Sequence, residues 1–438
     1  MKLSKINLLI IHGILGIVFT KYPFLSTYHG IFIILIGTFY ILEKPDPLEK
    51  YPLIFSAYIV GLEVLLRMAG ASLFWEFGKY AVIYFLILGL IRKSKKIQIY
   101  SPILVYFFLL LPAIIFVPMN SFNLWRQDVA FNLSGPATLA LSSIYFFNRR
   151  IDKNILNQIL FSMILPIISM AIYNIYTMPD LSTYRFMPYS DFYTSGGYGP
   201  NQVSTIFGLG IVGLITAQVL GIKLTGSKYL DILVLIIFFG LGLITFSRGG
   251  IFAAVISFIL AISYYLFHNQ KKMFMILKCF GLLIISVISW VSIVSITDGV
   301  ILQRYGFGRS GFGEKFILDL TGRALIYEID LNIFSNHIFT GVGPGQGFKL
   351  REKYGYGKQV AAHAEYTRLL AEHGLPGLFA LIILLSLVVI HIIRPGPLFS
   401  KFIKIIFGVL ALITMGHSAM RLAMPSFIYG FLLTQFEE

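Results

Sequence analysis

Apolar runs long enough to cross a bilayer recur along almost the whole chain, and no other feature limits the fold as strongly. A membrane-spanning helix needs about 20 predominantly apolar residues. Such runs occur near residues 6–21, 25–43, 51–68, 78–92, 102–119, 129–147, 155–178, 201–221, 229–246, 249–267, 275–296, 375–393, 403–419 and 421–436. Because backbone polar groups in lipid must be satisfied within their own segment, we predict an all-α polytopic membrane protein with about 12–14 transmembrane helices.

The composition agrees with this prediction and gives no sign of a separate soluble domain. Hydrophobic residues make up 57% of the 438 and charged residues only 13%, with a mean hydropathy of +0.80. Soluble proteins carry about 25% charged residues. No internal repeat is visible, so we predict that residues 1–438 form a single integral membrane domain. The first apolar run lacks a small-residue cleavage site, and we interpret it as an uncleaved span.

The distribution of lysine and arginine predicts which loops face the cytoplasm. With the N-terminus inside, the basic clusters at 92–96, 149–153 and 271–278 all fall inside, and so does the C-terminus. The long segment 297–374 also holds basic residues, but long loops are exempt from this rule, and we expect it outside, inserted between spans. Nucleic acid is a poor partner for the net charge of +15, because the outer basic residues are dispersed among membrane ends.

Single arginines stand beside the expected outer membrane ends. Arg248 lies in a turn of a few residues between two apolar runs, followed by two glycines that permit close backbone approach. A charge near the membrane is costly and marks a functional candidate, while snorkelling to lipid headgroups is the alternative. The other arginines in such positions are Arg126, Arg185 and Arg421.

The long outer segment predicts an amphipathic helix and a glycine turn. Thr321 can cap a helix over 321–336 that lies on the outer leaflet, and its expected apolar face comprises Leu325, Ile329 and Ile333. Arg323 would occupy the first turn, where the helix dipole disfavours a cation and a bound anion would offset the penalty. The stretch GVGPGQG at 341–347 lacks the lysine of a phosphate-binding loop, which favours a tight turn.

The stretch HAEYTRLLAEHGLPG collects charge at the start of the next apolar run. Its charged trio, spaced for contact on one helix, is a structural support and comprises Glu365, Arg368 and Glu372. Gly374 followed by Pro376 predicts a helix end. His363 has no partner within its own turn and is a candidate proton acceptor, against the alternative of a structural histidine.

Several of these segments together resemble one family. TFSRGG after a span, TGRALIYE and NHIFTGVGPGQGF in the long outer segment, and a histidine followed by GLPGL resemble the O-antigen ligases and polymerases. The resemblance covers about residues 200–393, with GPNQVSTIFGLG at 199–210 and FNLSGP at 131–136 as further similar segments. The ligase pattern places Asn, Ser or Gln after the histidine, and Ala364 departs from it.

The resemblance implies a GT-C-like glycosyltransferase in the bacterial inner membrane, with its active site facing the periplasm. It implies inverting transfer of an undecaprenyl-pyrophosphate-linked glycan without metal or other cofactor, with membrane lipid and a chain-length regulator as further partners. His363 would act as the base, and Arg248 and Arg323 would bind the pyrophosphate. The secondary candidates for substrate binding are Arg126, Arg185 and Arg421.

Ala364 and the FNLSGP segment favour a polymerase that extends a lipid-linked repeat unit. A ligase that transfers glycan to lipid A–core is the alternative. A transporter or flippase for the same lipid is less favoured, because it would need polar residues within spans and paired halves. Glu328 and Asp330 are the weak exception to the expected lack of metal ligands in the outer segments.

Overall fold

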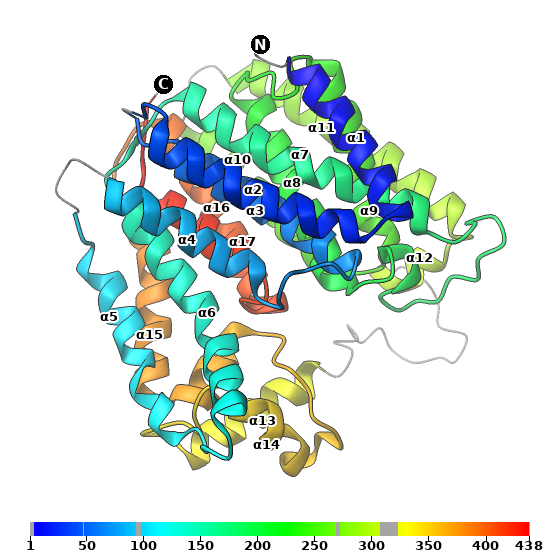
Figure 1. The fold of residues 1–438 in the computed structure, drawn as a ribbon. Coiled ribbons are helices and arrows are strands. Elements are labelled where there is room, and N and C mark those ends of the chain that lie inside the picture. Colours follow the sequence, from blue (N-terminus) through cyan, green and yellow to red (C-terminus); the bar gives the residue numbers. More distant parts are fainter. Residues whose placement is uncertain (1–3, 47, 93–97, 269–271, 307–322, 438) are drawn as a thin grey trace.

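The computed structural model describes residues 4–46, 48–92, 98–268, 272–306 and 323–437, and this part of the chain is almost entirely helical (Figure 1). Its α-helices are α1 (Lys5–Lys21), α2 (Phe24–Glu43), α3 (Tyr51–Met68), α4 (Phe77–Arg92), α5 (Ser101–Leu110), α6 (Phe122–Phe146), α7 (Lys153–Thr177), α8 (Pro200–Val219), α9 (Lys228–Ile244), α10 (Arg248–His268), α11 (Lys272–Ile296), α12 (Val300–Tyr305), α13 (Arg323–Asn336), α14 (Gln346–Arg351), α15 (Glu365–Ile393), α16 (Leu398–Ser418) and α17 (Ala423–Tyr429). Short 3-10 or π turns are η1 (Pro112–Phe116), η2 (Tyr193–Ser195), η3 (Glu352–Tyr356) and η4 (Gly430–Leu433). The strands β1 (Arg150–Ile151) and β2 (Gln435–Phe436) pair in parallel.

The prediction of an all-α polytopic membrane protein is confirmed. Eight helices in the described ranges are long and apolar enough to cross a membrane: α2, α3, α7, α8, α10, α11, α15 and α16. The other expected spans fall on helices that are shorter or more polar, among them α1, α4, α6 and α9. The last expected span, 421–436, is instead divided into α17 and η4, which are almost wholly buried by the surrounding helices.

The segments expected on the cytoplasmic side gather at one end of the helix bundle. Lys5 Nζ donates to the carbonyl of Leu224 at 2.7 Å, and the Gln435 amide donates to the carbonyl of Arg149 at 2.8 Å. Figure 1 shows both termini at this end and α13 and α14 at the opposite end. The predicted topology, in which the segment 297–374 lies across the membrane from the termini, requires such an arrangement.

Glycines allow the central helices to approach closely. A Cβ on Gly61 of α3 would collide with the carbonyl of Met163 in α7, and a Cβ on Gly250 of α10 would collide with the backbone of Ser204 in α8. Small residues at such crossings let helix backbones meet where lipid gives no hydrophobic drive to association. The predicted close approach after Arg248 is therefore confirmed, and it fixes the start of α10 against α8.

Helix α13 buries two of the three residues predicted for its apolar face, and it packs them on protein. Ile326, Ile329 and Ile333 are buried, and the last two pack with Ala371 of α15. Leu325 is 43% exposed, so its assignment to the apolar face was wrong. We expected the apolar face of α13 to lie on the outer leaflet. This expectation is also wrong, because α15 covers the buried face of α13. The proposed cap Thr321 lies outside the described residues.

The glycine-rich stretch after α13 is a tight turn, as predicted. Gly341, Gly343 and Gly345 have positive φ angles of 64°, 93° and 79°. The amide of Val342 donates to the carbonyl of Ala371 at 3.1 Å, and that of Gly343 donates to the carbonyl of Glu372 at 2.9 Å. Because these amides bond protein carbonyls, they are not presented to a phosphate, and the turn instead docks the outer segment on α15.

The helix end predicted at Gly374 is a kink within α15. Gly374 adopts φ 61° and ψ −140°, and the helix continues beyond it to Ile393. A Cβ at this position would lie 2.5 Å from the carbonyl oxygen of Ile338, and the amide of Leu375 donates to that same oxygen at 2.7 Å. The kink thus sets the angle between the transmembrane part of α15 and its first turns, which carry the candidate site.

Candidate active site

A cavity of about 880 Å³ opens at the end of the bundle far from the termini. The beginning of α4, the first half of α6, the outer segment 345–372 and the loop 419–421 form its walls. Its basic lining residues are Lys79, Arg126, Arg351, Arg368 and Arg421. The expectation that arginines would gather on this side of the protein is therefore met around a concave surface, which is the usual form of a small-molecule site.

Arg421 connects this cavity to His363. It lies in the loop between α16 and α17, and its Nη2 donates to the carbonyl of Ala362 at 2.5 Å. Burial, followed by the charge of Arg323, lowers the pKa of the Arg421 guanidinium to about 10. The group therefore stays charged at neutral pH, beside the peptide that precedes His363.

His363 is surrounded by cations. The pKa of its imidazole is lowered to about 3, first by burial and then by nearby Arg421, Arg323, Arg351 and His417 in that order of effect. Its Nδ1 is buried and makes no hydrogen bond to the described part of the chain. The imidazole is consequently neutral at physiological pH, the form that can accept a proton.

Arg248 and Arg323 stand at the first residues of α10 and α13. Burial and then the charge of Arg248 lower the pKa of Arg323, while Tyr327 acts in the opposite direction. Arg248 Nη1 donates to the carbonyl of Arg304 at 3.1 Å. A cation at a helix N-terminus opposes the helix dipole, and two such cations close together favour a bound anion.

The other two candidate arginines have different surroundings. Arg126 lines the cavity on the side of α6, where the sequence placed it among secondary binding residues. Arg185 is exposed in the segment between α7 and α8 and is not part of the cavity wall. The structure therefore brings Arg248, Arg323, His363 and Arg421 together, adds Arg126 to the adjoining cavity, and leaves Arg185 apart.

The sequence prediction missed His417 and Asn201. Asn201 Oδ1 lies 3.1 Å from His417 Nδ1, and Asn201 Nδ2 donates to the carbonyl of His417 at 2.9 Å. Gly249, beside Arg248, lies against the same imidazole. Asn201 belongs to the segment 199–210 that carries part of the family resemblance, so a signal for it was present. His417 had only its position four residues before Arg421.

The charged trio of α15 is a structural support, as predicted. Arg368 bonds Glu365 through Nη2 and Glu372 through Nη1, the latter at 2.8 Å, and all three side chains are buried. Arg368 also donates to the side chain and carbonyl of Asn132, both at 3.2 Å, and Glu365 accepts from the amide of Met420 at 3.3 Å. The trio thereby joins α15 to α6 and to the loop that carries Arg421.

Glu328 and Asp330 do not form a shared metal site. Glu328 is exposed, whereas Asp330 is buried on the other face of α13. The Asp330 carboxylate accepts from Arg351 Nε and from Thr367 Oγ1, each at 2.8 Å. It therefore orients Arg351 toward the site, and the weak metal hypothesis for this pair is wrong in geometry.

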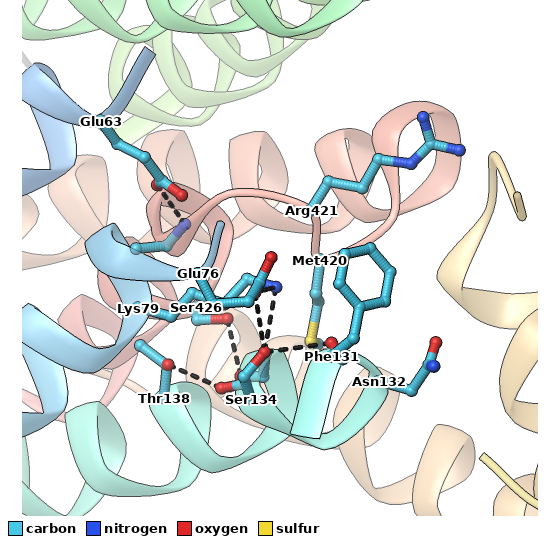
Figure 2. A network of polar contacts seen from close by, with 12 residues as sticks. Glu63, Glu76, Lys79, Phe131, Asn132, Ser134, Thr138, Met420, Arg421 and Ser426 are labelled. Atoms are coloured by element: carbon cyan, nitrogen blue, oxygen red, sulfur yellow. Dashed lines mark hydrogen bonds and ion pairs between the residues drawn. The ribbon is translucent and has the colours of Figure 1, made fainter. Parts of the chain in front are cut away.

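A second polar network fixes the wall formed by α4 and α6. Figure 2 shows Glu76, just before α4, and Lys79 of α4 converging on Ser134 of α6, with Glu63 and Arg421 nearby. Ser134 Oγ donates to Glu76 Oε2 at 2.9 Å and accepts from Lys79 Nζ at 3.2 Å. Glu63 pairs with Arg67 at 2.5 Å, as predicted, and also accepts from the amide of Ala423 at 2.8 Å. These bonds hold the loop 419–422 against the cavity wall.

Comparison with known protein families matches part of the chain. Residues 233–382 match the family model described as O-antigen ligase, and this range contains Arg248, Arg323 and His363. No curated protein matches the chain. The matched range supports activity of the O-antigen ligase and polymerase type in general. Over this range, about a third of its length, the protein is therefore similar to the O-antigen ligase family.

Proposed function

We propose that the protein is a surface-polysaccharide polymerase, which transfers a glycan from a lipid diphosphate to a second lipid-linked repeat unit. The observation that carries the proposal is a neutral, half-buried imidazole, His363, within the field of three guanidinium groups. Such a field suits a diphosphate leaving group, and the imidazole suits proton transfer. We place the reaction at the periplasmic face of the bacterial inner membrane, with undecaprenyl pyrophosphate as the lipid carrier.

The arginines would bind the diphosphate. Arg323 lowers the pKa of both His363 and Arg421 and is itself influenced by Arg248, so these cations share one electrostatic environment. Their repulsion is relieved when a dianion binds among them. Guanidinium groups bind phosphate oxygens in a bidentate manner, which orients the leaving group as well as neutralising it.

The chemical step follows from this arrangement. A hydroxyl oxygen of the acceptor sugar attacks the anomeric carbon of the donor while His363 accepts the hydroxyl proton. The bond between the anomeric carbon and the phosphate oxygen breaks, and the electron pair leaves with the lipid diphosphate. Arg248 and Arg323 stabilise the charge that develops there. A single displacement inverts the anomeric configuration, and guanidinium groups perform the charge neutralisation without a metal ion.

The choice of polymerase over ligase rests on the wall of the cavity. Phe131 and Asn132, from the FNLSGP segment that favoured a polymerase, line it. Ala364 gives less support than the sequence indicated, because it is 4% exposed and occupies the N-cap of α15 without lining the cavity. Asn and Ser are preferred N-caps, so a polar residue there stabilises the helix start. A ligase that uses lipid A–core remains the alternative.

Replacement of His363 tests the proposed step. We expect His363→Ala to reduce the rate of glycan transfer by about 10²–10⁴-fold, the usual contribution of a general base. The control is His337→Ala, because His337 is exposed in the same outer segment at the end of α13. Transfer is measured with purified protein in liposomes and lipid-linked repeat units. A His363→Ala protein that transfers glycan as fast as the control would refute the role of this residue.

A further inference from the structure

Resting on the proposed function, we propose that the cavity beside Arg421 is the subsite for the acceptor saccharide, with sugar rings stacked on Trp75 and Phe348 and a sugar hydroxyl bonded to Glu76. The wall of this cavity carries basic side chains, as the proposed diphosphate site does, but it has two further features. It combines aromatic faces with an unpartnered carboxylate oxygen, and both features suit an uncharged, polyhydroxylated ligand.

Aromatic side chains surround the cavity and remain uncovered. Trp75 is 58% exposed and Phe348 is 41% exposed, although both line a concave surface. Aromatic belts at membrane interfaces also expose such residues. Phe348 does not belong to a belt, because it lies in the short helix α14 of the outer segment and lines the same cavity as Trp75, which comes from a different part of the chain. The apolar C–H faces of sugar rings pack well on aromatic faces of this kind.

Glu76 supplies a hydrogen-bond acceptor at the same wall. Its side chain is 8% exposed, and Oε2 pairs with Lys79 and Ser134. Oε1 is buried without a hydrogen-bond donor in the described part of the chain, and Arg67 Nη2 lies 3.9 Å away, beyond hydrogen-bond range. A buried acceptor without a donor is costly and calls for an explanation. A ligand hydroxyl would provide the missing donor.

The position of the cavity assigns it to the acceptor. Its lining reaches Arg421 and Ala362, the residue before His363, but it does not include Arg248 or Arg323. The cavity and the proposed diphosphate site therefore have different lining residues, and both lie close to the base. An acceptor in the cavity and a diphosphate at Arg248 and Arg323 can therefore be bound at the same time, as the displacement requires.

Binding of free saccharide tests the subsite independently of catalysis. The probe is the oligosaccharide released by mild acid from the host's own lipid-linked repeat units, titrated calorimetrically into purified full-length protein. We expect saturable binding that Trp75→Ala and Phe348→Ala each weaken by about two- to tenfold, in line with the value of an aromatic contact. The same variants should raise the KM for the acceptor while kcat changes little. Phe339→Ala is the control, because Phe339 is 78% exposed in the outer segment and does not line the cavity.

Two further variants separate this inference from the proposed function. Glu76→Gln, checked for folding by thermal unfolding, should weaken binding of the same oligosaccharide. His363→Ala should bind it as tightly as the parent protein while losing transfer. The inference is overturned if the parent protein shows no saturable binding, or if Trp75→Ala and Phe348→Ala bind like Phe339→Ala. Retained transfer by His363→Ala would instead overturn the proposed function and leave the saccharide subsite standing.

Discussion

The acid limb of the pH profile depends on the electrostatic field around His363. Burial, followed by Arg421 and Arg323, lowers the pKa of the imidazole from 6.5 to about 3 in the ligand-free protein. The neutral form, which can act as a base, therefore persists well below pH 6.5. When the pH falls from 7.5 to 5.0, the neutral fraction of an imidazole with an unshifted pKa of about 6.5 decreases about 30-fold. An imidazole with a pKa near 3 stays almost fully neutral over the same range.

Substrate binding changes this field in a defined direction. A diphosphate brings negative charge beside Arg421 and Arg323, so the pKa of His363 rises in the complex. The profile of kcat/KM reports the free enzyme, and that of kcat reports the complex. We therefore expect kcat/KM to change by less than about twofold from pH 7.5 to 5.0, while kcat falls within this range. A diphosphate esterified at both phosphorus atoms keeps the same charge from pH 7.5 to 5.0. Titration of the substrate therefore does not cause the expected decrease in kcat.

The assay is the initial rate of glycan transfer by protein in liposomes, measured at several donor concentrations and pH values, with thermal unfolding at each pH as the stability control. Arg421→Gln removes the largest single charge that lowers the pKa of His363. We expect its kcat/KM profile to move toward neutral pH relative to the parent protein. A parental kcat/KM that already falls about 30-fold with a midpoint near pH 6.5 would refute the electrostatic argument.

Three other outcomes follow from the geometry. Arg248→Lys keeps the charge but loses the planar fork, and we expect a loss of about 2–4 kcal/mol of transition-state stabilisation in kcat measurements; a parental rate would contradict the diphosphate assignment. Lys358 is exposed in the outer segment, so Lys358→Cys in a Cys279→Ser background should react with an impermeant thiol reagent in intact spheroplasts, and protection there would contradict the topology. Arg368→Met leaves two buried carboxylates without their partner and should destabilise the protein by about 3–5 kcal/mol in thermal or denaturant unfolding; an unchanged Tm would show that the trio is not a support.

The helices were predictable from the sequence because hydropathy alone requires them in lipid. The buried face of α13 could not be predicted in this way, because that face packs on the protein and not on the bilayer. Leu325 fits the period of an amphipathic helix as well as Ile326 does, and only the position of α15 decides which of them is buried. The kink at Gly374 was likewise hidden, since glycine and proline signal a break in a helix but not whether the chain resumes it in the same direction.

Candidate site residues could be predicted from the sequence where a single charged or titratable side chain stands out from its apolar surroundings. Arg248, Arg323 and His363 stand in short polar stretches among apolar runs, and the structure brings them together. The pairing of Asn201 with His417 joins residues far apart in sequence, and neither residue has a charge that would single it out. Trp75 and Glu76 were missed for a similar reason, because a cavity is formed by several elements at once. Arg185 stays a prediction that the cavity does not support, since an arginine in an outer loop carries the same sequence signal whether or not the loop reaches the site.

Product length tests the central claim most directly. Purified protein in liposomes is given only undecaprenyl-pyrophosphate-linked repeat units, and the products are separated by size. The proposed polymerase makes a ladder of products two, three and more units long, and addition of lipid A–core leaves that ladder unchanged. A single transfer product that appears only when lipid A–core is present would contradict the polymerase and identify the protein as a ligase.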